Sequence, residues 1–206
     1  VVDAIEKRIR QGAFGYNTVP DTFRKSIIRW WQRRHRFTME KEWILYCTGV
    51  VPAISSIVRK MTEIGDDIVV LAPVYNIFYN SILNNGRKVL ASELRYADGS
   101  YTIDYADLEE KLSRETTSLF IFCNPHNPIG KVWDRPMLER IAELCIKHDV
   151  LVVSDEIHCD LTHFGHAYIP FASLSQEIAD RTISCIAPTK TFNIAGLQTA
   201  AIVISN

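Results

Sequence analysis

The chain has 206 residues, of which 47% are hydrophobic and 23% are charged, and its formal net charge is −1. This is the composition of a globular domain with a large core, and it lacks both the basic excess of nucleic-acid-binding proteins and any apolar run near the ~18 residues of a membrane span. The five cysteines are scattered and odd in number and no signal peptide is visible, so we expect a cytoplasmic protein with reduced thiols.

Short apolar segments alternate with amphipathic ones along the chain. The apolar segments are rich in β-branched residues, as in the central strands of a parallel sheet, and the others repeat apolar residues with helical spacing. In chain order the pattern predicts a helix at 53–64, a strand at 68–71, a helix at 75–83, a strand at 88–94, a helix at 105–112, a strand at 118–123, a helix at 136–148, and strands at 150–154 and 182–187. This alternation implies a three-layer α/β/α fold with a mostly parallel sheet and helices on both faces.

The chain is expected to form one domain over residues 1–206, because it contains neither an internal repeat nor a low-complexity linker. It begins without a methionine inside a helical pattern, and it ends directly after the apolar stretch at 200–204. We therefore expect this domain to be a piece of a longer protein.

Unusual polar residues follow three of the predicted strands. They are the run Asn-Pro-His-Asn-Pro-Ile-Gly at 124–130, Ser-Asp-Glu-Ile-His at 154–158 and Pro-Thr-Lys at 188–190. Ligands of open α/β sheets bind at the carboxyl ends of the strands. We therefore expect these three segments to form one site.

Lys190 is the most informative residue of that site. It lies between a strand and a turn of small residues, which suits a confined amine with a lowered pKa that reacts with a carbonyl group. Pyridoxal phosphate is the main cofactor that a lysine holds as a Schiff base, and it needs a carboxylate at its ring nitrogen. Asp155, at the end of a buried strand, suits that role. The alternatives are a solvated surface lysine and an aspartate that caps a helix or a turn.

Other residues have two possible roles each. Asn127 can donate to a phenolic oxygen, although Asn, Pro and Gly are also ordinary turn residues. Tyr75 can stack on a flat ring or belong to the core at a helix start. The backbone amides that follow Gly49, those of Val50 and Val51, can receive a phosphate at a helix N-terminus or can simply join a strand to a helix.

Taken together, the three runs resemble the core of the fold-type I pyridoxal-phosphate enzymes, the class I/II aminotransferase superfamily. Within it, the chain is most similar to the MalY/PatB type of cystathionine β-lyases, which are C–S lyases. This similarity rests on His158, where many aminotransferases carry a tyrosine, on Gly-Val-Val-Pro-Ala-Ile at 49–54 and on Phe-Asn-Ile-Ala-Gly-Leu at 192–197. The resemblance extends over essentially the whole chain.

The resemblance implies a role for each matching residue. Lys190 holds the cofactor and later moves protons, Asp155 pairs with the ring nitrogen, Asn127 bonds the phenolic oxygen, and Tyr75 stacks on the ring. His158 lies beside the ring. The expected phosphate-binding groups are the amides of Val50 and Val51, the side chains of Thr189 and Gln198, and Tyr16 from a neighbouring subunit of a homodimer.

The chain departs from the superfamily pattern at two positions. Gln198 stands where many relatives have an arginine that binds the phosphate, and Ala187 stands where many have a serine. The resemblance also implies that a short N-terminal segment and a C-terminal small domain, which carries the arginine for the substrate carboxylate, lie outside these 206 residues.

The leading hypothesis is a lyase that acts on cystathionine or related cysteine S-conjugates and releases a thiol, pyruvate and ammonia. An aminotransferase is the alternative, because both activities begin by removing the α-proton of an amino acid. A metal-binding module built from His158, Cys159, His163 and His166 is a third hypothesis, but its spacing fits no standard zinc pattern and no metal is expected. A non-catalytic binding protein is disfavoured by the joint presence of Lys190, Asp155 and Asn127.

Overall fold

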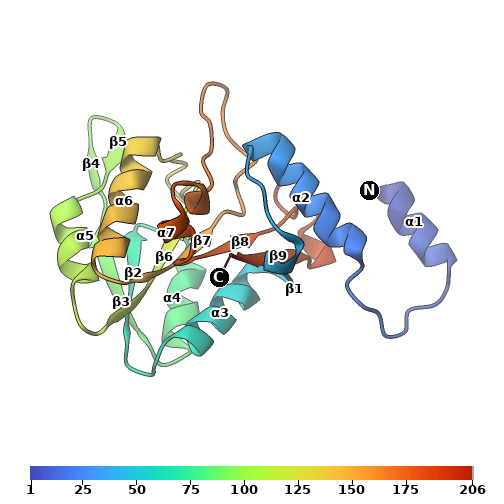
Figure 1. The fold of residues 1–206 in the computed structure, drawn as a ribbon, viewed down its shortest axis with the longest axis horizontal. Helices are drawn as coiled ribbons and strands as arrows, with labels where there is room; N and C mark the ends of the chain where they lie inside the picture. The colour runs from blue at the N-terminus through green and yellow to red at the C-terminus, as the bar shows by residue number, and fades with distance from the viewer. Residues whose placement is uncertain (206) are drawn as a thin grey trace.

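The computed structural model describes residues 1–205 and contains a seven-stranded sheet between two layers of helices (Figure 1). The strands lie in the order β1-β9-β8-β7-β6-β2-β3. All neighbours from β3 to β8 are parallel, whereas β9 is antiparallel to both β8 and β1. The bounds are β1 Ile44–Cys47, β2 Asp67–Ala72, β3 Lys88–Glu93, β6 Thr117–Cys123, β7 Leu151–Asp155, β8 Thr182–Ile186 and β9 Ala200–Ile204. The predicted α/β class with a mostly parallel sheet is confirmed.

Helices cover both faces of this sheet, which explains why strand β2 is apolar and buried from Ile68 to Ala72. Successive strand residues point to opposite faces. Ile68 and Val70 pack with helices α3 and α4, whereas Val69 and Leu71 pack with α5, α6 and α7. The bounds of these helices are α3 Val50–Met61, α4 Asn76–Leu83, α5 Tyr105–Leu112, α6 Arg135–Lys147 and α7 Gln176–Ala179. Each fully buried aliphatic side chain contributes about 1.5–3 kcal/mol to folding.

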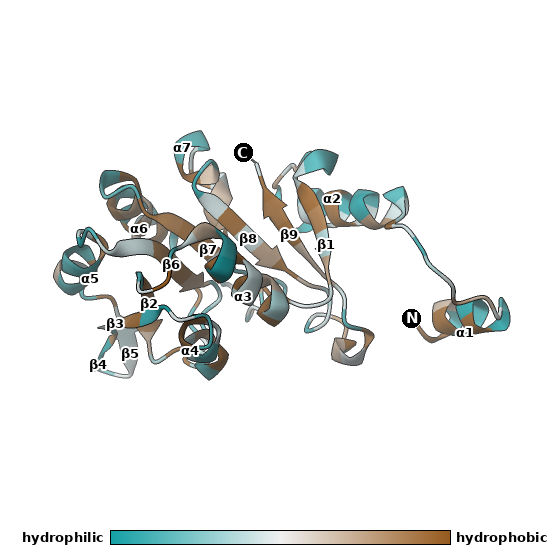
Figure 2. Cartoon of the chain, turned by 90° about the horizontal axis from the view of Figure 1, so that it is seen from below, coloured by the Kyte–Doolittle hydropathy of each residue, from teal (hydrophilic) through white to brown (hydrophobic). Residues whose placement is uncertain are grey.

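The N-terminal region is built differently. Helix α2, Asp21–His35, packs through Trp31 on β1 and β9 in a third hydrophobic cluster. Helix α1, Val2–Arg10, has no buried residue and stands away from the body at the end of an extended segment in both views (Figures 1 and 2). Figure 2 also shows the apolar character of the central strands. Within residues 1–205, no helix is both long and apolar enough to cross a bilayer.

The predicted elements are observed with shifted ends, and the helix predicted at 53–64 shifts most. It begins at Val50 because Pro52 lies in the first turn, where an amide hydrogen has no helical acceptor and proline is tolerated. It ends at Met61 because Thr62 adopts an extended conformation and its hydroxyl bonds the carbonyl of Val58 at 2.6 Å.

Several short elements were not predicted. Strand β1, Ile-Leu-Tyr-Cys, is an apolar run of only four residues at the edge of the sheet, where Leu45 and Tyr46 are exposed. So short an apolar run does not by itself distinguish a strand from a helix. A separate hairpin pairs β4, Arg95–Ala97, with β5, Ser100–Thr102. Its turn contains Asp98 and Gly99, both with positive φ, which is a recognisable hairpin signal. Helix α7, with four residues, is too short to show helical periodicity.

Candidate active site

The ends of three neighbouring parallel strands form the candidate site. Strand β7 lies between β6 and β8, and Asp155 is in register with Cys123 on one side and Cys185 on the other. The segments 124–130, 154–158 and 188–190 therefore leave the sheet side by side at one edge. The prediction that they meet at the carboxyl ends of the strands is confirmed.

Asp155 places a buried carboxylate at the centre of this edge. Asp155 is only 5% exposed, and its Oδ1 accepts a hydrogen bond from the backbone amide of Ile157 at 3.1 Å. Burial raises the pKa of Asp155 to about 7, although the Ile157 amide and the positive charge of Lys190 act in the opposite direction. Within residues 1–205, no side chain donates to this carboxylate, so it is free to accept from a ligand.

Lys190 follows β8 in a turn whose preceding residue, Thr189, is buried. Its charge lowers the pKa of both Asp155 and His158, so the ammonium group lies within electrostatic range of both. The prediction of a confined lysine is wrong for the described residues, because Lys190 is exposed. The turn lies at the surface, and no segment within 1–205 covers it.

Asn127 and His158 line one cavity of about 470 Å³, together with residues from the loop 161–166. Both side chains are half-buried. Burial lowers the pKa of His158, and the nearby charge of Lys190 lowers it further, so its ring favours the neutral form. Lys190, Asp155, Asn127 and His158 are thus gathered at one end of the sheet.

Strand β1 brings a helix N-terminus to the same edge. Strand β1 is antiparallel to β9, which is antiparallel to β8, so β1 and β8 run in the same direction. Helix α3 starts directly afterwards, with Gly49 at its N-cap and no side chain bonded to its first amides. The amides of Val50 and Val51 point out of the first helical turn without an intrahelical acceptor, which is the arrangement that binds anions. Glycine suits the N-cap position, because a Cβ atom at Gly49 would lie 3.3 Å from Cδ of Pro52, which is closer than an ordinary van der Waals contact.

Tyr75 belongs to the loop that follows β2, at the same edge. The imidazole of His126 lies 2.9 Å from the carbonyl oxygen of Pro73, and this contact ties the Tyr75 loop to the Asn127 loop. Tyr75 is 37% exposed, and its ring meets the ring of Phe78 edge-on at 6.0 Å between centroids, which leaves a face of the ring for stacking.

The remaining predicted residues have different surroundings. Thr189 is buried beside Lys190, whereas Gln198 is exposed and has a left-handed backbone with φ of 47°. Tyr16 is fully exposed in the extended segment after α1, so the structure does not bring it to the site of its own chain.

Two acidic residues beside the site are not predicted from the sequence. Glu156 is fully buried, and its Oε1 accepts from the Ser154 hydroxyl at 2.8 Å and from the Phe171 amide at 3.1 Å. Its position directly after Asp155 at a strand end is the signal that could have revealed it. Asp160 contacts Trp30, which is 130 residues away in the chain, and no local pattern encodes that contact.

The fold and the site define an α/β protein that presents a lysine, a buried carboxylate and an open helix N-terminus at the carboxyl edge of its sheet. The family described as "Aminotransferase class I and II" matches residues 1–206. The chain belongs to this family.

Individual relatives agree with that assignment. The chain is 48% identical over 204 residues to cystathionine beta-lyase PatB of Bacillus subtilis, covering 99% of this chain and 53% of that protein. It superposes on a PLP-bound putative aminotransferase from Clostridium difficile 630 with a TM-score of 0.96 and 43% identity, covering 100% of this chain and 53% of the other. It superposes on cystalysin from Treponema denticola, which contains pyridoxal 5'-phosphate, with a TM-score of 0.97 and 37% identity, covering 100% and 52%. The chain thus spans about half the length of the relatives it matches.

Proposed function

We propose that the full-length protein is a pyridoxal-phosphate-dependent C–S β-lyase that acts on cystathionine or related cysteine S-conjugates. The observation that carries the proposal is the buried Asp155 carboxylate, which has an unshared oxygen and lies within electrostatic range of Lys190. The similarity to a cystathionine beta-lyase supports the substrate class. Residues 1–206 are proposed to be the cofactor-binding large domain of this enzyme.

The residues at the site fit the cofactor. Burial raises the pKa of the Asp155 carboxyl group to about 7. This group becomes fully ionised when a cationic ring nitrogen donates to it, because the ion pair offsets the loss of hydration. At an effective dielectric of about 20, such a pair at 4 Å is worth about 4 kcal/mol. We therefore assign the pyridine nitrogen to Asp155, the phenolic oxygen to Asn127, the face of the ring to Tyr75 and its vicinity to His158.

We assign the phosphate of the cofactor mainly to backbone amides rather than to charged side chains. The amides of Val50 and Val51 are open at the start of α3, and the side chains of Thr189 and Gln198 supplement them. Gln198 is neutral where many relatives carry an arginine, so we expect the helix N-terminus to provide most of the phosphate affinity. Tyr16 of a second subunit completes this site if the protein forms the proposed homodimer.

When bound, pyridoxal phosphate supplies an electron-withdrawing ring that stabilises a carbanion at the substrate α-carbon. Lys190 acts as the general base that takes the α-proton. Asp155 holds its negative charge against the ring nitrogen. The electron pair left on the α-carbon would form a double bond to the β-carbon as the bond between the β-carbon and sulfur breaks, and the departing thiolate would take up a proton. The remaining enamine would then take up water and give pyruvate and ammonia.

An aminotransferase is the second candidate, because the chain also resembles a putative aminotransferase. The assay that separates the two uses full-length protein with pyridoxal phosphate and cystathionine, without a keto-acid acceptor. Stoichiometric release of pyruvate and free thiol supports the lyase. Turnover that occurs only when a keto acid is added refutes the lyase and supports the aminotransferase.

The composition and the reduced thiols favour a cytoplasmic enzyme.

A further inference from the structure

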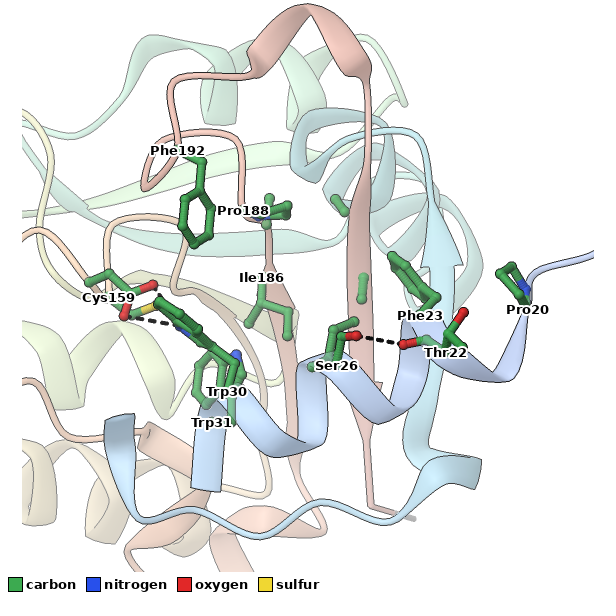
Figure 3. Close-up of a pocket in the computed structure, with 15 residues that line it drawn as sticks. Pro20, Thr22, Phe23, Ser26, Trp30, Trp31, Cys159, Ile186, Pro188 and Phe192 are labelled. Carbon is green, nitrogen blue, oxygen red and sulfur yellow. Dashed lines mark hydrogen bonds between the residues drawn. The ribbon is translucent and has the colours of Figure 1, made fainter. Parts of the chain in front are cut away.

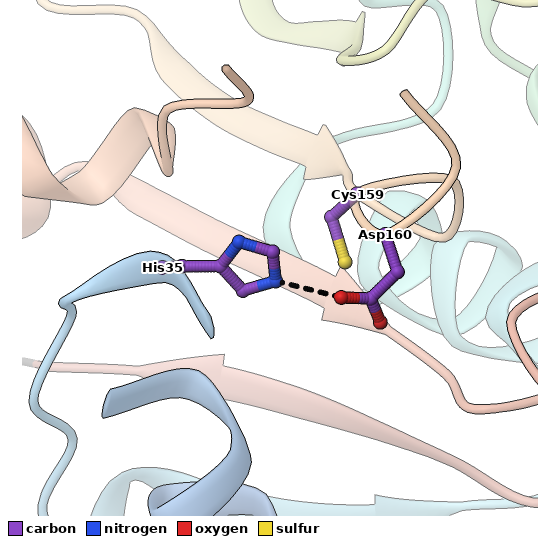
Figure 4. A group of neighbouring side chains, drawn as sticks. All are labelled: His35, Cys159 and Asp160. Carbon is purple, nitrogen blue, oxygen red and sulfur yellow. Dashed lines mark ion pairs between the residues drawn. The ribbon is translucent and has the colours of Figure 1, made fainter. Parts of the chain in front are cut away.

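Asp160 joins three separate segments of the chain at the border of the candidate site. Its side chain is only 6% exposed. Its Oδ2 accepts a hydrogen bond from the indole Nε1 of Trp30 at 3.0 Å and another from the hydroxyl of Thr191 at 3.0 Å. Nε2 of His35 lies 3.1 Å from Oδ1, as Figure 4 shows. Helix α2, the turn after β7 and the turn of Lys190 therefore share one carboxylate.

The carboxylate is held in its charged form. Burial acts to raise the pKa of Asp160, but His35, Thr191 and Trp30 outweigh burial, and the pKa is lowered. The guanidinium of Arg34, with Nε 3.6 Å from Oδ1, adds a positive charge. Hydrogen bonds to an ionised acceptor are about twice as strong as those between neutral groups. The contact between Asp160 and Thr191 is therefore a firm anchor.

Contacts from α2 also hold the residue after Thr191. The rings of Trp30 and Phe192 meet edge-on with centroids 5.3 Å apart, and both line an apolar cavity of about 480 Å³ (Figure 3). The turn closes on itself, because the Phe192 amide bonds the carbonyl of Pro188 at 3.0 Å. The backbone of Lys190 lies within this turn, while its side chain is exposed.

A metal ion is the competing explanation for this cluster, because potential ligand atoms of His35, Cys159 and Asp160 lie within 4.8 Å of one another. Two features oppose it. Both Asp160 oxygens already face donors, and Arg34 places a cation beside them. Burial raises the pKa of Cys159, and the charges of Asp160 and Glu156 raise it further, so its thiol stays protonated and is a poor ligand. The cluster is thus an anchor between segments.

We propose that Asp160 is a positioning residue for Lys190: its carboxylate ties Thr191 to Trp30 of α2 and so fixes the backbone of Lys190 beside Asp155. Asp160 acts through its hydrogen bonds to Thr191 and Trp30. The inference rests on the proposed function, since Lys190 must be the residue that captures pyridoxal phosphate. A displacement of about 1 Å at a reacting group can cost on the order of 100-fold in rate.

The test measures how fast Lys190 captures pyridoxal phosphate in the cofactor-free, full-length protein. Samples are reduced with borohydride at increasing times, and peptide mass mapping quantifies the cofactor that remains attached to Lys190. We expect Thr191→Val and Asp160→Ala to slow capture about tenfold or more. Thr191→Ser keeps the hydroxyl and should restore capture to within about twofold of wild type. Asp180→Ala removes an exposed carboxylate that lies before β8 and should leave the rate unchanged.

Urea unfolding identifies which variants are folded. If Asp160→Ala does not fold, Thr191→Val still decides, because it removes only the link to the turn. Capture at the wild-type rate in folded Thr191→Val would overturn the inference and leave the proposed function intact. If the wild-type protein itself attaches no pyridoxal phosphate to Lys190, the proposed function fails and the inference fails with it.

Discussion

Replacing Asp155 with asparagine should stabilise the cofactor-free protein increasingly as pH rises from 5 to 8, although it should destroy cofactor function. In the unfolded chain an aspartate loses its proton near pH 3.8, whereas burial raises the folded pKa of Asp155 to about 7. Between these values the unfolded state binds fewer protons than the folded state, so the wild-type protein loses stability as pH rises. The difference of about 3 units corresponds to a loss of about 4 kcal/mol above pH 7.

Asparagine has the shape of aspartate and retains an oxygen that can accept from the Ile157 amide, but it carries no charge. The Asp155→Asn variant should therefore exceed the wild type in unfolding free energy by an amount that grows with pH. From the two pKa values we expect an advantage of about 1.5 kcal/mol at pH 5 and about 4 kcal/mol at pH 8. Comparison with the wild type removes the contribution of titrating groups that both proteins share and that do not interact with Asp155.

The assay is equilibrium urea unfolding of both proteins without pyridoxal phosphate at a series of pH values from 5 to 8. A difference in unfolding free energy that does not change with pH would refute the reasoning, because it would mean that Asp155 is ionised in the folded state throughout. A variant that is less stable than the wild type at pH 8 would refute it equally.

Three further predictions concern stability and use the same urea assay. Arg87→Met should cost about 3 kcal/mol, because the buried guanidinium donates to the hydroxyl and carbonyl of Thr62; a cost below about 1 kcal/mol would show that water replaces it. Trp133→Phe should cost about 1–3 kcal/mol by leaving the carbonyl of Cys123 without its donor, now at 3.1 Å, and an unchanged midpoint would contradict this. Gly130→Ala should cost about 1 kcal/mol, because an alanine is strained at a φ of 67°. The cost should be no larger, because no atom lies within 4 Å of the added methyl group; a cost above about 3 kcal/mol would mean a clash.

The central strands and the location of the site could be predicted from the sequence for a simple physical reason. A strand covered by helices on both faces must be apolar throughout, so β2, β6 and β8 are visible in the sequence as apolar runs. Polar residues directly after such runs must lie at the sheet edge. That rule places Asp155, Asn127 and Lys190 at one edge of the sheet.

Features that depend on distant contacts could not be predicted in the same way. The antiparallel return of β9 between β8 and β1 follows from pairing across the sheet, which no local pattern encodes. The link from Asp160 to Trp30 joins positions 130 residues apart. The exposure of Lys190 likewise depends on which other segments cover its turn, and residue spacing carries no information about that. Local periodicity predicts elements, whereas tertiary neighbours decide burial.

The most direct test of the account is the visible absorbance of full-length protein incubated with pyridoxal phosphate and then freed of unbound cofactor. We expect an absorbance band from bound cofactor in the wild type and its loss in Lys190→Ala, with both proteins shown to be folded by urea unfolding. A band of equal strength in Lys190→Ala, or no band in the folded wild-type protein, would contradict the claim that Lys190 holds the cofactor.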